Sequence, residues 1–294
     1  MHLPILVKET LKVLEPKKDE NFVDATFGEG GFSFELAKHL DSGKVLAFEW
    51  DPELYKLGVE KIKNLKMEKK IKLVNQNFKN IKRIVKKEGF NQIKGVVFDL
   101  GISTWHYEKS RRGFSFKYDE PLDMRINPKI KVTAFEIINY YSYKDLVEIF
   151  KNYGQEKEAE KVATEIIKRR STKKIETSKE LAQIIAEVKK IKKKKLHPAT
   201  QIFMALRSFI NNELVNIYQG VKDSYDILAE GGKIIVISFQ GLEDKIIKKV
   251  FKYLKELKDA QIITKKVIKP SREEILKNPK ARSAKLRALA KPEK

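Results

Sequence analysis

A glycine-rich segment is the first place in the sequence where chemistry is expected. Residues 24–31 (DATFGEGG) follow a short apolar run directly and lead into a stretch with helical spacing. Glycines let a backbone approach a ligand closely, and the start of a helix offers free N–H groups. Gly28, Gly30 and Gly31 are spaced G-x-G-G rather than G-x-G-x-x-G, which disfavours a dinucleotide-dependent dehydrogenase. A tight strand-to-helix turn also uses glycine, so this cluster alone is a weak signal.

Three further residues stand at the ends of predicted strands. Glu49 ends the second strand, where an acidic side chain can accept hydrogen bonds from both ribose hydroxyls of a nucleoside. Phe78 follows the third strand and could lie against an adenine ring, and Asp99 ends the fourth, beside the place where a reacting methyl group would point. Open α/β sheets bind ligands at the carboxyl edge of their strands. These residues therefore predict a nucleoside-cofactor site, and the alternative is that they are ordinary strand-end caps.

The elements that must hold these residues alternate between strand and helix. Buried strands are predicted at 21–26, 44–49, 71–75 and 95–100, with helices at 32–40, 51–65 and 81–88 between them. A further strand at 232–239, a helix at 242–257 and weaker strands at 261–268 and 284–290 would complete a seven-stranded sheet. The alternation predicts an α/β fold with a mostly parallel sheet that is covered on both faces.

Residues 105–196 break this alternation. They hold no strong strand pattern but several amphipathic stretches, at 134–138, 143–152, 157–170 and 178–188. We interpret them as an inserted all-helical domain for substrate recognition, which divides the α/β domain into residues 1–104 and 197–294. A long helix is predicted from Pro198 to about Gln219. The lysine run at 189–195 is typical of a solvated surface, although beside an RNA site it would add phosphate affinity.

Charge and cysteine content limit the function classes. The 294 residues include 62 Lys and Arg against 40 Asp and Glu, a formal net charge of +22, which favours a polyanionic partner such as nucleic acid. A lysine-rich, heat-adapted proteome would explain the charge content but not this imbalance. The chain has no cysteine, which excludes disulfides, cysteine-based metal sites and the covalent route to C5-methylation of cytosine. Without a signal pattern or a long apolar segment, a cytoplasmic protein is expected.

Several long motifs bring the chain close to a known family. They are 24–33 (DATFGEGGFS), 99–103 (DLGIS), 111–125 (RRGFSFKYDEPLDMR), 197–214 (HPATQIFMALRSFINNEL), 237–248 (ISFQGLEDKIIK) and 278–287 (NPKARSAKLR). With them the chain resembles, over nearly its whole length, the bacterial small-subunit ribosomal RNA cytosine N4-methyltransferases, the MraW or RsmH family. The resemblance implies a class I, Rossmann-like fold that uses S-adenosylmethionine (SAM). It also implies methylation of N4 of a cytidine in the decoding region of 16S ribosomal RNA.

Carried over by position, the resemblance implies a cofactor site made of Gly28, Gly30, Gly31, Phe32, Glu49, Phe78, Asp99 and His106. Some of these residues depart from the family pattern. Phe32 stands where histidine is common, and His106 replaces a glutamine. Gln240 and Gly241 replace a His-Ser pair, while Glu49 keeps the expected carboxylate with one more methylene.

The exocyclic N4 of cytosine is a poor nucleophile, because its lone pair is delocalised into the ring. An enzyme that methylates it must therefore make this nitrogen more reactive. We expect Asp99 and the backbone up to Ser103 to accept hydrogen bonds from that amino group and hold the reacting atoms in line. Asp99 could instead only anchor the cofactor. The sulfonium is already activated, so no metal is needed.

Substrate-binding residues are expected after the fourth strand. Arg111, Arg112, Phe114 and Phe116 combine guanidinium groups with rings, which suits phosphate pairing and stacking on an extruded cytosine. Alternatively, the phenylalanines belong to the core and the arginines cap the insert.

Two more pairs of polar residues are candidates for the substrate site. Asp123 and Arg125 form either a structural ion pair or a pair that orients RNA. Arg207 and Asn211 share a face of the predicted long helix, as an active-site wall or as a buried polar network.

The resemblance implies 16S ribosomal RNA and the small ribosomal subunit as partners, with neither a membrane nor a metal, and a homodimer is compatible with it. Two other function classes stay open. A class I methyltransferase for a small molecule or a protein is disfavoured by the charge and by the Arg/Phe loop. A catalytically silent RNA-binding or ribosome-assembly factor on the same fold is kept open by the departures at Phe32, His106 and Gln240.

Overall fold

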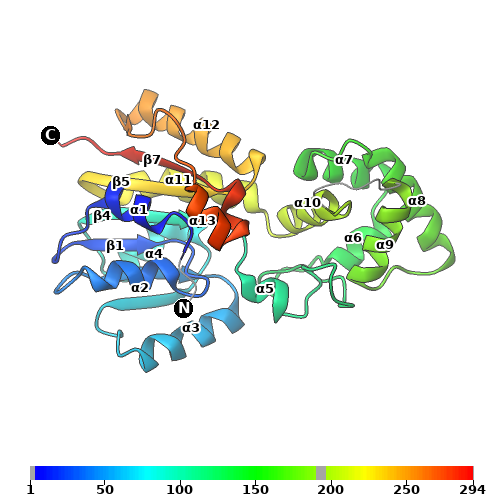
Figure 1. The fold of residues 1–294 in the computed structure, drawn as a ribbon, viewed down its shortest axis with the longest axis horizontal. Coiled ribbons are helices and arrows are strands. Elements are labelled where there is room, and N and C mark those ends of the chain that lie inside the picture. The colour runs from blue at the N-terminus through cyan, green and yellow to red at the C-terminus, as the bar shows by residue number, and fades with distance from the viewer. Residues whose placement is uncertain (1–3, 190–196, 294) are drawn as a thin grey trace. The chain divides into compact units, whose positions relative to one another are not determined.

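The computed structural model describes residues 4–189 and 197–293 and divides into two compact units. Unit 1 comprises Met1–Ile102 and Leu214–Lys294, and unit 2 comprises Ser103–Glu213. Figure 1 shows strands in the first unit and a helical second unit. The chain therefore leaves the α/β unit once and returns to it once, as expected for an insertion.

Unit 1 is built on a seven-stranded sheet in the order β3-β2-β1-β4-β5-β7-β6. The first five of these strands pair in parallel, and only β7 runs opposite to its neighbours. The strands are β1 (Asn21–Asp24), β2 (Val45–Glu49), β3 (Ile71–Asn75), β4 (Ile93–Asp99), β5 (Leu228–Ser238), β6 (Gln261–Ile262) and β7 (Lys285–Ala290). This topology confirms the predicted fold class.

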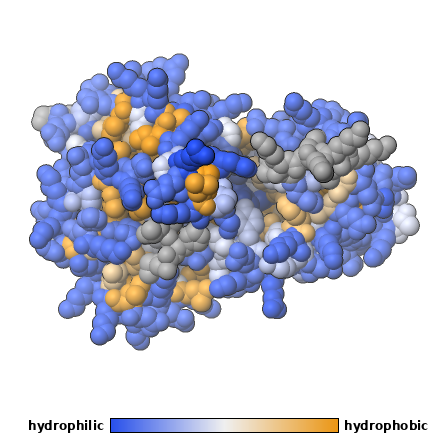
Figure 2. Space-filling model, in the orientation of Figure 1, coloured by the Kyte–Doolittle hydropathy of each residue, from blue (hydrophilic) through white to orange (hydrophobic). Residues whose placement is uncertain are grey.

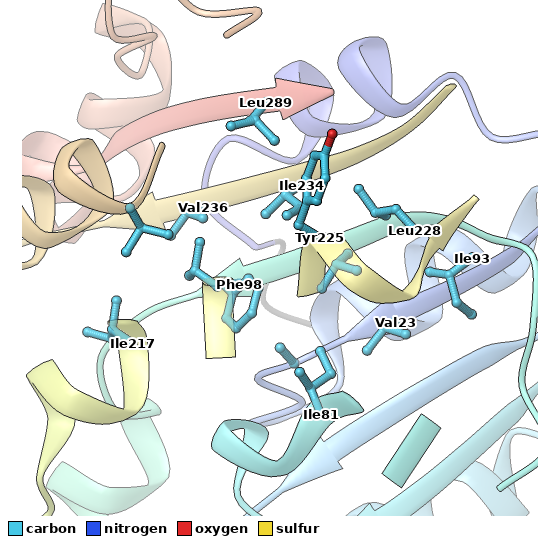
Figure 3. Packing of buried hydrophobic residues seen from close by; sticks show 14 of the residues in the cluster. Val23, Ile81, Ile93, Phe98, Ile217, Tyr225, Leu228, Ile234, Val236 and Leu289 are labelled. Atoms are coloured by element: carbon cyan, nitrogen blue, oxygen red, sulfur yellow. The ribbon is translucent and has the colours of Figure 1, made fainter. Parts of the chain in front are cut away.

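Helices cover both faces of the sheet, because the central strands are apolar on both sides. One face packs against α4 (Ile81–Lys87), α11 (Glu213–Ile227) and α12 (Gly241–Lys258). Figure 3 shows part of this cluster, including Ile81 of α4 and Ile217 and Tyr225 of α11. The other face packs against α1 (Val7–Leu14), α2 (Gly31–Lys38) and α3 (Pro52–Asn64). The remaining elements of unit 1 are the 3-10 turns η1 (Phe78–Asn80) and η2 (Pro279–Ser283) and the short helix α13 (Arg272–Lys277).

The sixth strand is shorter than predicted. β6 covers two residues instead of 261–268, because the hydroxyl of Thr264 takes the place of a backbone carbonyl in accepting the N–H of Ala288, at 2.9 Å. The ladder resumes only as an isolated bridge between Ile268 and Leu286.

Unit 2 contains six helices within its described residues. They are α5 (Thr104–Glu108), α6 (Ala134–Tyr140), α7 (Tyr143–Gly154), α8 (Ala159–Thr172), α9 (Ser178–Lys189) and α10 (Thr200–Ile210). Side-chain caps start two of them: Thr133 and Ser142 each close a capping box with the acidic residue three positions later. The predicted amphipathic stretches thus correspond to α6 to α9, within a few residues at each end.

The predicted long helix after Pro198 is wrong, because the chain forms two helices there. α10 ends at Ile210 and α11 begins at Glu213, and Asn212 between them has a φ of 50° in the left-handed region. Asparagine tolerates that conformation, which stops a helix. The break also moves the domain boundary: α10 belongs to unit 2, where the backbone of Gln201 approaches Gly154 of α7 too closely for any side chain at residue 154.

The surface seen in Figure 2 is mainly hydrophilic, with apolar residues scattered among charged ones. Within the described residues, no helix combines the length and the apolar composition that a membrane crossing requires.

Candidate active site

The glycine turn lies between β1 and α2, and two of its glycines have conformations that other residues rarely adopt. Gly28 has a φ of 54° and Gly30, the N-cap residue of α2, a φ of 86°. A Cβ atom on Gly30 would lie 2.3 Å from the ring of Phe34, and one on Gly31 would lie 3.2 Å from Pro4. The left-handed backbone and the short distance to Phe34 therefore both require glycine in this turn.

Asp24 at the end of β1 fixes the beginning of this turn. Its carboxylate accepts hydrogen bonds from the Thr26 N–H at 3.1 Å and from the Ser33 hydroxyl at 2.6 Å. The Thr26 hydroxyl oxygen in turn accepts the Asp99 N–H at 2.7 Å, which joins the turn to the end of β4. Burial raises the pKa of Asp24 to about 6, against the effect of these hydrogen bonds.

Glu49 lies where the sequence predicts a ribose-binding carboxylate, and it is buried. One oxygen accepts the Gly28 N–H at 3.0 Å and the other accepts the Asp51 N–H at 2.8 Å. Burial, assisted by repulsion from Asp51, raises the pKa of Glu49 to about 8. An ionised carboxylate offers about four acceptor sites, so hydroxyl groups can still donate to Glu49 beside these amides.

Asp99 ends β4 on the sheet face that carries α2. Val97, two residues earlier in the strand, packs in the cluster of that face, and side chains two residues apart in a strand point the same way. The Oδ1 atom of Asp99 is fully enclosed and has no hydrogen-bond partner in the described protein. Burial raises the pKa of Asp99 to about 8, with further contributions from the charges of Asp24 and Glu243.

Glu243 is a carboxylate of the site that the sequence analysis did not single out. It is buried in the first turn of α12, and it accepts the N–H groups of Phe239 and Gln240 at 2.9 and 3.0 Å. An acidic residue three positions after a helix start is the usual signal of a capping box, and this signal was present in the sequence. The contribution of its charge to the raised pKa of Asp99 depends on the tertiary fold, so no pattern in the neighbouring sequence predicts it.

Two predicted aromatic residues of the cofactor site differ in exposure. Phe78 in η1 is half-buried and meets the ring of Phe98 edge-on, with 5.5 Å between ring centroids, so part of its surface stays open. Phe32, the second residue of α2, is buried in the core. A ligand at the glycine turn would therefore meet the backbone of Phe32 rather than its ring.

The residues of unit 1 fit a cationic nucleoside. A glycine turn, a carboxylate suited to ribose hydroxyls and a half-exposed ring stand at successive strand ends. Three acids, Asp24, Glu49 and Asp99, lie at this edge with pKa values that burial raises, and the Oδ1 atom of Asp99 has no hydrogen-bond partner in the described protein. SAM carries a sulfonium and an ammonium group, and a cation beside these acids would favour their ionised form. Among the described residues, no group of His, Asp and Glu side chains could hold a metal ion.

In unit 2, the structure brings together Ser103 and His106. The Ser103 hydroxyl and the Nδ1 atom of His106 are hydrogen-bonded at 3.1 Å, and the buried imidazole ring meets Trp105 and Phe114 edge-on. Phe114 is itself buried, so it contributes to the core of this unit and not to an exposed stacking surface.

Arg112 holds the predicted substrate loop together from inside. It is buried, its Nη1 donates to the carbonyl oxygens of Arg125 at 3.2 Å and Ile126 at 2.9 Å, and its guanidinium lies over the ring of Trp105. Arg111, in contrast, is exposed and has a φ of 54°. Of the two neighbouring arginines, Arg111 is therefore the one that can reach a phosphate.

The residues of the two polar pairs make hydrogen bonds within this unit. Asp123 and Arg125 form a two-pronged ion pair with 2.7 and 2.8 Å between their atoms. Arg207 pairs in the same way with Glu213, at 2.7 and 3.0 Å. Asn211 is fully buried, and its amide group binds the backbone of residues 124 and 126 at 2.8 and 2.7 Å. Arg207 and Asn211 thus belong to a buried polar network.

Phe116 is stacked on His197, with ring centroids 4.2 Å apart and an angle of 18° between the planes. One face of the Phe116 ring is therefore covered by protein. Of the lysine run at 189–195, residues 190–195 lie outside the described residues. Lys189 is not a solvated side chain, because its ammonium group is buried against Glu156 at 2.5 Å.

The parallel sheet with one antiparallel strand, and the acidic edge beside its glycine turn, define a Rossmann-like methyltransferase that uses SAM as its cofactor. The model of the MraW methylase family matches residues 1–292. The chain belongs to this family.

Curated relatives match along the whole chain. Ribosomal RNA small subunit methyltransferase H of Persephonella marina is 43% identical over 288 residues, which cover 97% of both chains. The protein of the same name from Caldicellulosiruptor saccharolyticus is 39% identical over 306 residues, with 99% of both chains covered. That from Ehrlichia canis is 39% identical over 299 residues, which cover 99% of this chain and 100% of the relative.

Proposed function

We propose that this methyltransferase transfers the methyl group of SAM to the exocyclic N4 of a cytidine in the decoding region of small-subunit ribosomal RNA. The names of its relatives and the net charge of +22 support an RNA substrate in the cytoplasm. The observation that carries the reaction type is the half-buried carboxylate of Asp99 at the acidic edge of the sheet, for which no side-chain hydrogen bond is found within the described protein. An acceptor at that place can bind the hydrogens of an amino group.

The proposed mechanism needs few protein groups. Bound SAM supplies a methyl group that its sulfonium already activates. Ionised Asp99 and the backbone up to Ser103 accept hydrogen bonds from the target amino group, which localises the nitrogen lone pair toward the methyl group. After transfer the nitrogen must lose a proton, and Asp99, whose pKa is raised to about 8, is basic enough to take it. A purely anchoring role of Asp99 toward the cofactor would leave the proton to water.

The roles of the other residues follow their geometry. Within unit 1, the proposed cofactor site consists of Gly28, Gly30, Gly31, the backbone of Phe32, Glu49, Phe78 and Asp99. In unit 2, Arg111 and the Phe116–His197 stack are the proposed direct RNA contacts, because they are accessible. The buried or paired residues of unit 2 keep the loop in shape instead: Arg112, Phe114, Asp123, Arg125, Arg207 and Asn211.

Methyl transfer to ribosomal subunits tests the proposal. Small subunits from cells that lack the corresponding enzyme are incubated with the protein and radiolabelled SAM, and the labelled nucleotide is mapped by nuclease digestion and mass spectrometry. Label at one cytidine of the decoding region is the expected result. Cofactor binding without label in the RNA would contradict it and favour a non-catalytic assembly role.

A further inference from the structure

Positive charge is concentrated in one short stretch of unit 1. Residues 61–90 contain ten Lys and one Arg against two Glu, although they make up only about a tenth of the chain. They form the end of α3, the strand β3 and the helix α4. Because β3 is the last strand on its side of the sheet, this charge lies at an open edge of the unit.

A groove of about 590 Å³ lies at this edge. Five lysines and two glutamates, Glu68 and Glu88, line it, together with the half-buried rings of Tyr55 and Phe90 and a few aliphatic side chains. The lysines are Lys44, Lys63, Lys69, Lys70 and Lys72. Cationic walls beside aromatic rings are the combination that binds nucleic acid strands, through phosphate pairing and stacking.

The five lysines are not equivalent. Lys70 donates to backbone carbonyls of unit 1, and Lys72 pairs with Glu88 at 2.7 Å. Lys44, Lys63 and Lys69 are exposed, and in the part of the chain that the structure describes no carboxylate lies within ion-pair distance of their ammonium groups. These three come from separate segments, before β2, at the end of α3 and before β3. Three separate charges along an open groove match a chain of phosphates better than one small anion.

The groove is distant from the proposed site of methyl transfer. Lys44 and Lys69 precede the amino ends of their strands, whereas Glu49 ends β2 on the opposite edge. The five residues of β2 span about 16 Å between the amino and the carboxyl ends of the strands. A ligand in the groove therefore adds affinity without touching the reacting atoms.

We propose that this groove is a second docking surface for the backbone of the RNA substrate, remote from the methylated base. The inference rests on the proposed RNA substrate and adds a contact that anchors the surrounding RNA. Each lysine that neutralises a phosphate releases counterions from the RNA. RNA affinity should therefore fall more steeply with rising salt concentration when the lysines of the groove are present than when they are replaced.

A triple variant with K44Q, K63Q and K69Q tests the proposal. Its dissociation constant for decoding-region RNA and for unmodified small subunits is measured between about 50 and 200 mM salt. The matched control is K245Q, K249Q and K255Q, which removes three exposed lysines of α12 and changes the net charge equally. A second variant with arginine at residues 44, 63 and 69 keeps the charge and should keep the affinity.

We expect the slope of log affinity against log salt concentration to be smaller in magnitude by about 2 to 3 in the groove variant, since each phosphate contact contributes about 0.7 to 0.9. Affinity near physiological salt should fall roughly tenfold to a hundredfold on the same basis. KM for RNA should rise while kcat and the affinity for SAM stay unchanged. A groove variant whose RNA dissociation constant matches that of the α12 control within about twofold would overturn the proposal. Binding of inorganic phosphate or of a ribosomal protein, instead of RNA, in the groove would overturn it as well. Failure of the proposed function would appear separately, as absent methyl transfer by the unchanged protein.

Discussion

Replacing Asp99 by asparagine should stabilise the free protein and weaken its hold on the cofactor. The two side chains have the same shape, but the amide group carries no charge to bury. Asp99 shares its surroundings with the charges of Asp24 and Glu243, and its enclosed oxygen has no partner in the described protein. The amide of asparagine could donate a hydrogen bond where the carboxylate can only accept one.

The size of the stability gain follows from the pKa of Asp99, which burial raises from 3.8 to about 8. Because the folded-state pKa is raised, Asp99 destabilises the fold progressively as the pH rises from about 4 to about 8. Each pKa unit corresponds to about 1.4 kcal/mol, but relaxation and water penetration reduce the full shift considerably. We expect a gain on the order of 2 kcal/mol at pH 8, or about 4 to 8 °C in Tm for a protein of this size.

Cofactor affinity should change in the opposite direction. The loss of a charged hydrogen-bonding group facing a cationic ligand costs about 1.5 to 3 kcal/mol, so Kd should rise roughly tenfold to a hundredfold. Thermal unfolding between pH 5 and pH 8.5 and calorimetric titration with SAM measure both effects, with Asp119→Asn at an exposed site as the control. A lower Tm at pH 8 together with an unchanged Kd would refute the account of this carboxylate.

Three further outcomes are expected. The affinity of the unchanged protein for SAM should increase from pH 6.5 to pH 8.5, because Glu49 and Asp99 must ionise and both have a pKa of about 8. The increase should be smaller in Glu49→Gln. Calorimetric titrations that give the same affinity of the unchanged protein at both pH values would contradict this prediction. Gly30→Ala should lower the free energy of unfolding by about 1 to 3 kcal/mol, because φ is 86° and the new Cβ would lie 2.3 Å from the ring of Phe34; an unchanged thermal midpoint would argue against the turn as described. Asn211→Ala should cost about 2 to 4 kcal/mol, because it leaves buried backbone groups of the substrate loop unpaired, and denaturant unfolding would show no loss if the side chain were only a surface contact.

Much of the cofactor side could be predicted because its signals are local. Gly28 to Gly31 follow a short apolar strand, Glu49 and Asp99 each end one, and parallel strands bring their carboxyl ends to one edge wherever they pair. Neither the register nor the sheet order was needed to place these residues together.

The substrate unit was harder to predict because its polar residues work over long sequence distances. Asn211 binds backbone atoms 85 and 87 residues away, and Lys189 is buried against a partner 33 residues away. Nothing in the neighbourhood of either residue distinguishes a surface side chain from a buried one. The break between α10 and α11 was missed although Asn212 tolerates the left-handed conformation, because an asparagine within an otherwise helical pattern is also compatible with a continuous helix.

The identity of the methylated nucleoside tests the central claim most directly. RNA labelled by the protein is digested to nucleosides, and the labelled product is compared with authentic standards by chromatography and mass spectrometry. The account predicts N4-methylcytidine, and only when Asp99 is intact. Label on C5 of cytosine or on a ribose oxygen would contradict the proposed role of Asp99 as an acceptor for an amino group.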